Sequence, residues 1–417
     1  MAMVAVLALL VAACSSGGHA AQSAQNAAQA KAATAAADVK ITPANGAADA
    51  DPSAGITVTA VHGTLKNVSV HTPAGAVTGS LSPGGKAWHS QWALATSQSY
   101  TVTATASEGG QNVTTASSFR TLTPRSEFQT QIFEGYQQTY GVGMPIMLTF
   151  SQPITNRAAV ERSLQLTTSK PVVGAWSWDG SEHLDFRPQT YWPANTQVSV
   201  DAHLNGVEGA SGVYATEDLT QSFTIGASVI AVASTTSHQT QIYYNGALKY
   251  DWPISTGKAS TATPNGTYLT IEKENPVRMI GGTPGTAGYY NELVPWSVRF
   301  TFSGDYYHDA PWSVGSQGYT NVSHGCVNLS PADAQTYYNL AVPGDPITVT
   351  GSTKAGEWDD GWTEWFLSWS QFVKGSALHE AVKAGPDGSS FVDSAALPAS
   401  TGSSPLQAPA ADNWMSS

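Results

Sequence analysis

Cys326 lies in a segment whose residue types could perform nucleophilic chemistry. It is the only cysteine beyond the first 14 residues of this 417-residue chain, so a disulfide does not account for it. Its neighbours in Ser323-His324-Gly325-Cys326-Val327-Asn328 are polar or small, whereas a structural cysteine is usually buried among apolar groups. A nearby histidine can favour the reactive thiolate, and His308 lies upstream. The pattern predicts a cysteine nucleophile whose pKa lies below the ~8.5 of a free cysteine. An inert buried cysteine is the alternative.

No metal or cofactor is predicted to assist this cysteine. Glycine permits close backbone approach, so the N–H groups of Gly325 and Cys326 could point at the oxyanion that develops when a carbonyl is attacked. The other histidines, from His19 to His379, are scattered without the spacing of metal ligands.

The first 14 residues resemble an export signal of the lipoprotein type. Residues 2–13 are twelve apolar positions, too few to span a bilayer, which needs about 20, but suited to the core of a secretory signal. Val11-Ala12-Ala13-Cys14 is similar to a bacterial lipobox, whose cysteine is lipidated and becomes the mature N-terminus. We therefore expect residues 1–14 to be a lipoprotein signal peptide, and Cys14 to anchor the protein at the extracytoplasmic face of the cell membrane. An ordinary signal peptide with an incidental cysteine is the alternative.

The composition argues against a nucleic-acid partner. Charged residues make up 12% of the sequence, the formal net charge is −12, and Lys and Arg form no cluster. A protein that binds nucleic acid usually shows a basic patch, and none is present in this sequence.

Short alternating segments predict two β-sandwiches after a tether. Residues 15–38 are nearly all Ala, Ser, Gln and Gly, which is typical of a flexible linker. Residues 39–123 contain β-branched runs such as 56–61, separated by turns rich in Gly and Pro, and residues 124–227 contain a second set. We expect two tandem immunoglobulin-like (Ig-like) domains without the disulfide of antibody domains, because neither contains a cysteine.

Residues 228–351 predict a third, β-rich domain that carries the cysteine. Asn245-Gly246 indicates a hairpin, because both central positions of a type I′ turn need positive φ. A short helix is expected to begin after Ser330, an N-cap residue followed by proline, and to run to about Leu340. The predicted fold class is therefore mostly β.

A helical segment and a tail are expected after residue 351. Residues 352–383 are rich in tryptophan, and aromatic residues spaced three and four apart within 357–373 indicate an amphipathic helix. We expect this helix to dock against the third domain rather than a membrane, since it has no basic face. Residues 384–417 are dominated by Ala, Pro, Ser and Gly, which is typical of a disordered tail.

Four segments of the third domain carry a family resemblance: Ser323–Asn328, Tyr307–Ser313, Ser255–Lys258 and Thr263–Gly266. Together they resemble the L,D-transpeptidases of the YkuD-like family. Two preceding Ig-like domains and a Trp-rich segment afterwards are similar to the actinobacterial, mycobacterial-type members. The resemblance covers about three quarters of the chain.

This resemblance implies a peptidoglycan L,D-transpeptidase that acts in cell-wall biogenesis and is sensitive to carbapenems. Such enzymes attack the bond between the third residue of a tetrapeptide stem and its terminal D-Ala. D-Ala leaves, and the stem is held as a thioester on the cysteine. The side-chain amine of a second stem then resolves the thioester as a 3→3 cross-link. The implied partners are a donor stem and an acceptor stem, without a cofactor.

Position by position, the resemblance makes Cys326 the nucleophile and His308 its general base and acid. The backbone carbonyl of Asp309 would orient His308, and the Asp309 carboxylate would raise the pKa of the imidazole. His324 and Gly325 would form the oxyanion region. The implied substrate-binding residues are Tyr290, Met279, Trp312, Ser323 and Asn328.

Other interpretations stay open. If water resolves the thioester, the enzyme is an L,D-carboxypeptidase, and attachment of a lipoprotein to the wall would be a third outcome. A different class is a non-catalytic, lipid-anchored wall-binding protein in which the Ig-like domains matter. The intact pair of His308 and Cys326 argues against that class.

Overall fold

The computed structural model describes residues 37–286 and 289–397, in two compact units that divide between Thr123 and Pro124. The signal peptide predicted for residues 1–14, with its anchor Cys14, and nearly all of the linker predicted for 15–38 lie outside the described residues. No helix among the described residues is long and apolar enough to cross a bilayer. The predicted mostly-β fold class is confirmed.

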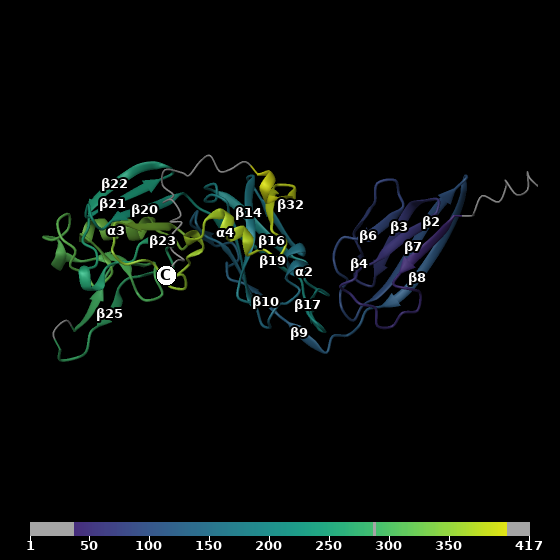
Figure 1. Cartoon of the computed structure of the whole chain (residues 1–417), viewed down its shortest axis with the longest axis horizontal. Coiled ribbons are helices and arrows are strands. Elements are labelled where there is room, and N and C mark those ends of the chain that lie inside the picture. The colour runs from purple at the N-terminus through teal and green to yellow at the C-terminus, as the bar shows by residue number, and fades with distance from the viewer. Residues whose placement is uncertain (1–36, 287–288, 398–417) are drawn as a thin grey trace, which may run out of the picture. The chain divides into compact units, whose positions relative to one another are not determined.

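The first unit is a β-sandwich of two four-stranded sheets, ordered β1-β2-β6-β5 and β4-β3-β7-β8 (Figure 1). Its strands are β1 Asp38–Thr42, β2 Thr57–His62, β3 Thr64–Thr72, β4 Gly75–Ala76, β5 Gly79–Leu81, β6 Ala87–Ser90, β7 Ser99–Glu108 and β8 Gln111–Arg120. In β7, Tyr100, Val102 and Ala104 are buried while the residues between them are more exposed. This alternation is what a strand with one face on a core requires.

The second unit begins with another sandwich. Its sheets are ordered β10-β12-β15-β14-β31-β32 and β11-β19-β16-β13, with a small third sheet β17-β18-β9. The elements before residue 226 are β9 Ser126–Phe128, β10 Thr130–Ile132, β11 Thr139–Tyr140, β12 Ile146–Phe150, α2 Arg157–Arg162, β13 Leu164–Thr168, β14 Val172–Asp179, β15 His183–Pro188, β16 Thr196–Ala202, β17 Glu208–Ala210, β18 Val213–Ala215 and β19 Leu219–Ile225. Trp176, Trp178 and Trp192 are buried in it.

The third domain combines a five-stranded sheet, β22-β21-β20-β30-β23, with a four-stranded sheet, β24-β27-β28-β29, and a separate hairpin, β25-β26. Its elements are β20 Val229–Ser234, β21 Gln239–Tyr244, β22 Ala247–Pro253, η1 Ala259–Thr261, β23 Gly266–Leu269, β24 Glu272–Glu274, β25 Val277–Gly281, β26 Tyr290–Val294, β27 Ser297–Arg299, β28 Tyr306–Asp309, η2 Pro311–Ser313, β29 Val327–Leu329, α3 Pro331–Leu340 and β30 Pro346–Thr350. Helix α3 begins as predicted, because the Ser330 side chain accepts a hydrogen bond from the Asp333 N–H.

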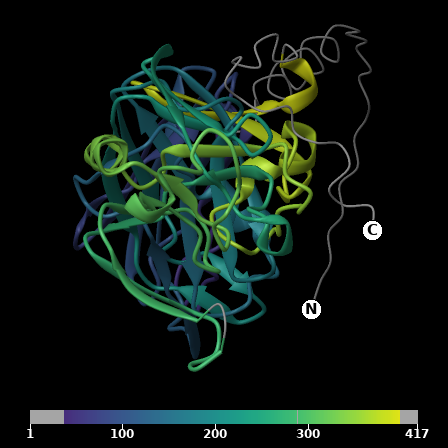
Figure 2. The same ribbon diagram turned by 90° about the vertical axis from the view of Figure 1, so that its left-hand side faces the viewer.

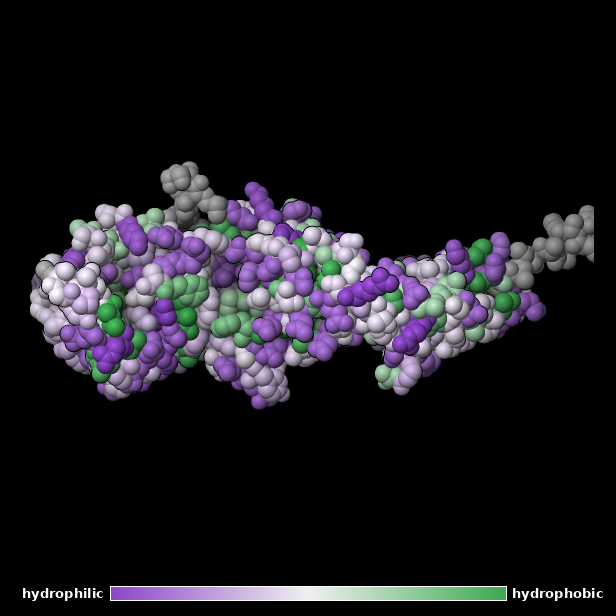
Figure 3. Space-filling model, turned by 90° about the horizontal axis from the view of Figure 1, so that it is seen from below, coloured by the Kyte–Doolittle hydropathy of each residue, from purple (hydrophilic) through white to green (hydrophobic). Residues whose placement is uncertain are grey.

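The β25-β26 hairpin projects from the body of the third domain (Figures 1 and 2). Its strands pair antiparallel, with Met279 opposite Glu292 and Gly281 opposite Tyr290. The space-filling view shows apolar residues only in small patches within a mostly polar surface (Figure 3).

The Trp-rich segment is not one helix, so the prediction for 357–373 is wrong. It forms a 3-10 turn, η3 Glu364–Phe366, and a separate helix, α4 Trp369–Lys374. Leu367 between them is extended, and its carbonyl accepts a hydrogen bond from Arg187 at 2.8 Å instead of a helical N–H. Ser368 then begins α4 with a capping box.

The same segment packs mainly on the second sandwich, and not on the third domain as expected. Nε1 of Trp365 donates to the carbonyl of Gly143 at 2.7 Å, and Phe372 is buried against Ala175. Phe366 instead contacts the third domain, where it packs against an aromatic ring of strand β23. The aromatic residues therefore connect the two domains rather than covering one of them.

The prediction of a disordered tail from residue 384 is wrong for residues 384–397, which contain the end of one strand, a second strand and a 3-10 turn. β31 Glu380–Gly385 pairs with β14, and β32 Gly388–Asp393 pairs with β31, followed by η4 Ser394–Ala396 (Figure 1). Without β31, the edge of β14 would present unpaired backbone N–H and C=O groups. Pairing with β31 provides hydrogen-bond partners for these groups. Residues 398–417 lie outside the described residues.

Candidate active site

Two parallel strands bring Cys326 and His308 to one side of the third domain. Strand β28 pairs with β29 so that His308 lies opposite Asn328. Tyr307 and Val327 also lie opposite each other, and both are fully buried in the domain core. Because side chains alternate along a strand, Cys326, His308 and Asn328 point away from that core.

A cavity of about 470 Å³ lies where these side chains point. It is lined by Met279, Tyr290, Glu292, Val294, His308, Trp312, Val322, Ser323, His324, Cys326 and Asn328. Eight of the ten residues assigned to chemistry or substrate binding from the sequence are in this list. The other two, Asp309 and Gly325, adjoin His308 and Cys326 in the chain.

The main chain orients His308. Its Nδ1 lies 2.8 Å from the carbonyl oxygen of Asp309, so Nδ1 carries the proton and Nε2 is left with a lone pair. The ring is buried, and burial lowers the pKa of His308 to about 4. The expectation that the Asp309 carboxylate raises this pKa is wrong, because loss of hydration outweighs the other influences. Trp312, which is 62% exposed, lies beside the imidazole with ring centroids 6.1 Å apart.

The thiol of Cys326 is protonated in this environment. Burial raises its pKa to about 12, and the nearby Asp305 carboxylate acts in the same direction. The backbone N–H groups of Tyr306 and Cys326 oppose this rise. The sulfur donates to the carbonyl of Gly304 at 3.8 Å. The two pKa shifts favour a neutral thiol and a neutral imidazole in the free site over the low-pKa thiolate expected from the sequence.

Gly325 allows an unusual backbone conformation at the cysteine motif. Its N–H is not free, although the sequence predicted a free N–H for the oxyanion. Its φ of +142° lies in a region that side chains disfavour. Its N–H donates to Oγ of Ser323 at 3.2 Å, and that hydroxyl donates to the carbonyl of Cys326 at 2.6 Å. Because the Gly325 N–H is already engaged, the N–H groups of Tyr306 and Cys326 that face the sulfur are better placed to meet an oxyanion.

Two segments that precede the cysteine motif in the sequence hold it in place through hydrogen bonds. The N–H of Lys258 donates to the carbonyl of Ser323 at 3.0 Å, which ties the Ser255–Lys258 loop to the cysteine segment. Oγ1 of Thr263 accepts from the N–H of Gly257 and donates to the carbonyl of Gly325. On the far side, Asn328 donates from Nδ2 to Ser313 at 3.1 Å.

The hairpin closes the cavity on another side. Tyr290 from β26 lies against the ring of His324, with centroids 5.1 Å apart, and Met279 lines the cavity from β25. Nε2 of His324 lies 3.1 Å from the ammonium group of Lys258. Partial burial and this positive charge lower the pKa of His324. Sequence reasoning missed Glu292 and Val294, although counting every second residue from Tyr290 along the strand would have found both.

A second cavity, of about 690 Å³, also reaches Cys326. It is lined by Ala259, Ser260, Thr261, Ala262, Tyr290, Ser303, Gly304, Asp305, His324, Gly325, Cys326, Thr353 and Lys354. Tyr290, His324 and Cys326 belong to both cavities. The nucleophile is therefore accessible from two directions.

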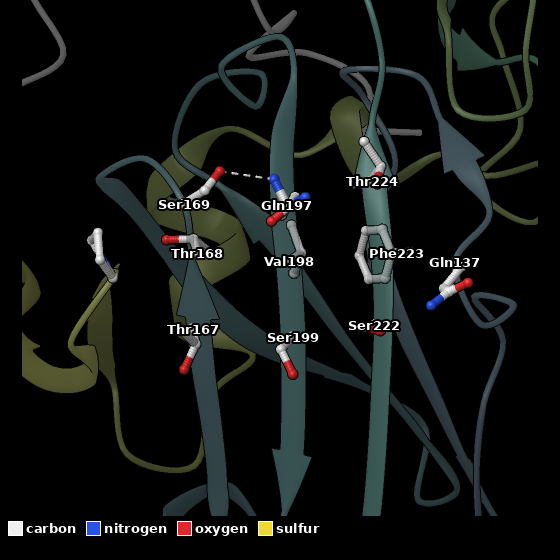
Figure 4. A pocket seen from close by; sticks show the side chains of 11 residues that line it. Gln137, Thr167, Thr168, Ser169, Gln197, Val198, Ser199, Ser222, Phe223 and Thr224 are labelled. Carbon is white, nitrogen blue, oxygen red and sulfur yellow. Dashed lines mark hydrogen bonds between the residues drawn. The ribbon is translucent and has the colours of Figure 1, made fainter.

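A third cavity, of about 520 Å³, lies on the second sandwich and carries no comparable chemistry. Figure 4 shows it on strands β13, β16 and β19, between side chains such as Thr167, Ser199 and Gln197. Its described lining residues bear hydroxyl, amide and apolar groups, and none is a histidine, a cysteine or a charged residue. Among the described residues, no group of three or more His, Cys, Asp or Glu side chains could hold a metal ion.

Comparison with known proteins gives matches to both parts of the chain. Residues 47–208 match the bacterial Ig domain family, and residues 228–349 match the L,D-transpeptidase catalytic domain family. The chain is 34% identical over 341 residues to L,D-transpeptidase 2 of Mycobacterium tuberculosis, covering 80% of this chain and 83% of that protein. It is 36% identical over 349 residues to L,D-transpeptidase 5 of the same species, covering 81% and 76%. A solved structure of the LD transpeptidase LdtMt1 in complex with imipenem is 37% identical, with a TM-score of 0.46, over 54% of this chain and 100% of that one.

Proposed function

The chain belongs to the L,D-transpeptidase family, and we propose that it cross-links peptidoglycan stems through an acyl-thioester on Cys326. The family assigns the activity, whereas the roles of individual residues rest on the geometry of the site. The observation that carries the proposal is that Cys326 and an imidazole oriented by the main chain line one cavity.

The first half of the reaction uses the cavity that holds His308. A donor tetrapeptide stem binds there with the peptide bond before its terminal D-Ala next to Cys326. The thiol proton moves to Nε2 of His308 as the sulfur attacks the carbonyl carbon. The C–N bond breaks when His308 returns this proton to the leaving amine of D-Ala, and the stem remains as a thioester. The Asp309 carbonyl stabilises the transient imidazolium by accepting from its Nδ1–H.

The second cavity supports transfer to an amine over hydrolysis. A thioester on Cys326 can be approached from this cavity while the donor stem occupies the first one. Water would not require a further cavity of about 690 Å³, whereas a second stem peptide would. We therefore favour the transpeptidase over the L,D-carboxypeptidase.

Mass spectrometry of the reaction with a purified disaccharide-tetrapeptide tests this proposal. A dimer linked through two third-position residues, with release of D-Ala, is the expected product. A tripeptide alone would indicate the carboxypeptidase, and unchanged substrate would indicate a wall-binding protein. Cys326→Ala is the control that should leave the substrate unchanged.

We also propose that the protein is held at the extracytoplasmic face of the membrane by a lipid on Cys14. The support is the apolar run of residues 2–13, whose end forms the segment Val11–Cys14 together with the cysteine that follows it. A lipid anchor at this point would keep the catalytic domain beside the wall that it modifies.

A further inference from the structure

Asp305 lies in the second cavity, beside the nucleophile. The residue precedes strand β28, and its carboxylate packs against the backbone next to Cys326. A methyl group placed on Gly325 would come within 2.1 Å of Oδ1 of Asp305, so the carboxylate occupies the space that a side chain at 325 would take. Asp305 lines the second cavity and not the first, whereas His308 lines the first and not the second.

The second half of the proposed reaction needs a base in this cavity. An aliphatic amine with a pKa near ~10.4 is an ammonium at neutral pH and has no lone pair with which to attack. It must lose one proton before attack and a second one as the amide forms. We propose, on the basis of the function proposed above, that Asp305 accepts the first of these protons from the acceptor ammonium.

Both protons that the acceptor ammonium loses can then be accounted for. The acceptor ammonium gives one proton to the Asp305 carboxylate, and the neutral amine attacks the thioester carbonyl. The C–S bond breaks, and the second N–H proton returns to the sulfur through His308. Asp305 finally releases its proton to solvent. The products are the new amide, the free thiol and one proton.

The two histidines of the site are less suited to this first step. His308 lies in the donor cavity and has the task of exchanging a proton with the sulfur and the leaving amine. His324 reaches the second cavity, but the Lys258 ammonium is directed at its Nε2 and weakens it as a base. Asp305 adds a negative charge that an ammonium group would approach favourably.

The ionisation of Asp305 fits this role. Burial raises its pKa to about 6, and among charged neighbours Lys354 lowers it while Asp360 raises it. A base works best when its pKa is close to the pH at which the enzyme operates. The groups that interact electrostatically with Asp305 are Lys354, Asp360, Cys326, Tyr290 and Tyr268.

The full chain with Asp305→Asn separates this role from a structural one. Formation of the dimer from disaccharide-tetrapeptide should fall by ~10²-fold or more, the effect of removing a positioned base. Acylation by a carbapenem should be unchanged or faster, because the carboxylate raises the pKa of the Cys326 thiol. Transfer to hydroxylamine, which is largely unprotonated at neutral pH, should keep its wild-type rate. Asp359→Asn, an exposed acid of the neighbouring loop, is the matched control.

The outcomes distinguish this inference from the proposed function. If the wild type forms no dimer, the proposed function fails. If the wild type and Asp305→Asn form dimer equally fast, or if transfer to hydroxylamine falls as much as dimer formation, only the role of Asp305 is wrong. Should Asp305→Asn not fold, the wild-type pH profile decides. Dimer formation should decline below about pH 6. Transfer to methoxyamine, a weaker base than hydroxylamine that stays largely unprotonated there, should not decline, and a shared profile would overturn the inference.

Discussion

His308 donates its Nδ1–H to the carbonyl oxygen of Asp309 at 2.8 Å, so the imidazole is oriented by the main chain and not by a carboxylate. The Asp309 side chain is therefore expected to matter far less than the histidine. His308→Ala should slow acylation by a carbapenem ~10²–10⁴-fold, and Asp309→Asn should cause a much smaller decrease. Intact-protein mass spectrometry over time gives both rates. Equal losses would mean that the carboxylate is needed.

The ionisation of the free thiol can be measured directly. Because burial raises the pKa of Cys326 to about 12 and lowers that of His308 to about 4, both groups are neutral at pH 7. Alkylation by iodoacetamide without substrate should be slow and should keep rising beyond the ~8.5 of a free cysteine. His308→Ala should show the same profile. A plateau below pH 8.5 that vanishes in His308→Ala would instead indicate a thiolate–imidazolium pair.

Glu134 should make the second sandwich less stable as the pH rises from the acid range to about 8. Burial raises the pKa of this carboxyl group to about 8, against ~4.3 for an unfolded glutamate. The folded state therefore binds more protons, and its stability falls as the pH rises from about 4.3 through 8. We expect Glu134→Gln to raise the free energy of unfolding by at least ~1 kcal/mol near pH 8, since one pKa unit is worth about 1.4 kcal/mol.

Denaturant unfolding of this variant at acid and alkaline pH provides the check. The difference from wild type should shrink near pH 5, where Glu134 is protonated in the fold. The matched control is the exposed Glu217→Gln, which should differ little at either pH. A Glu134→Gln protein less stable than wild type near pH 8 would show that the buried carboxyl is favourable.

The first unit should be dispensable for acylation, whereas loss of the second sandwich should destabilise the protein. A chain that begins at Pro124 keeps one compact unit complete and should form the carbapenem adduct at the wild-type rate. A chain that begins at Ser228 leaves Trp365 and Phe372 without the groups that bury them. It should have a lower melting temperature and aggregate more readily. Equal melting temperatures would show that the aromatic segment does not depend on the sandwich.

The lipid anchor predicts a change in location. Cys14→Ser should lose labelling by a fatty-acid probe and move from the membrane to the soluble fraction of cells. Cys326→Ala should stay with the membrane, because it leaves the N-terminal segment intact. Membrane association of Cys14→Ser would show that another feature anchors the protein.

Sequence alone could predict those parts of the molecule that depend on local pattern. The strand character of β7, the start of α3 at Ser330 and the motif around Cys326 each lie within a few neighbouring residues. The convergence of Met279 and Tyr290 on the same cavity followed from the family resemblance, since they lie on a hairpin far from the cysteine in sequence.

Properties set by distant contacts could not be predicted. Polar neighbours of Cys326 indicated an ionised thiol, but the pKa depends on burial by other parts of the fold. Spacings of three and four in the Trp-rich segment fit two short turns as well as one helix. The choice between them depends on the hydrogen bond that Arg187 donates to the carbonyl of Leu367. Arg187 is remote in sequence, so the local pattern could not reveal this contact. Asp305 belongs to no motif and is identified by the cavity alone.

Strand β14 acquires its outer neighbour from a segment that follows the whole catalytic domain in the sequence. During synthesis, the second sandwich is therefore incomplete until the catalytic domain has been made. A product truncated after the catalytic domain would keep its nucleophile but expose a sheet edge that can pair with another copy. Loss of β31 and β32 would thus favour self-association of the protein rather than yield a shorter, well-behaved enzyme.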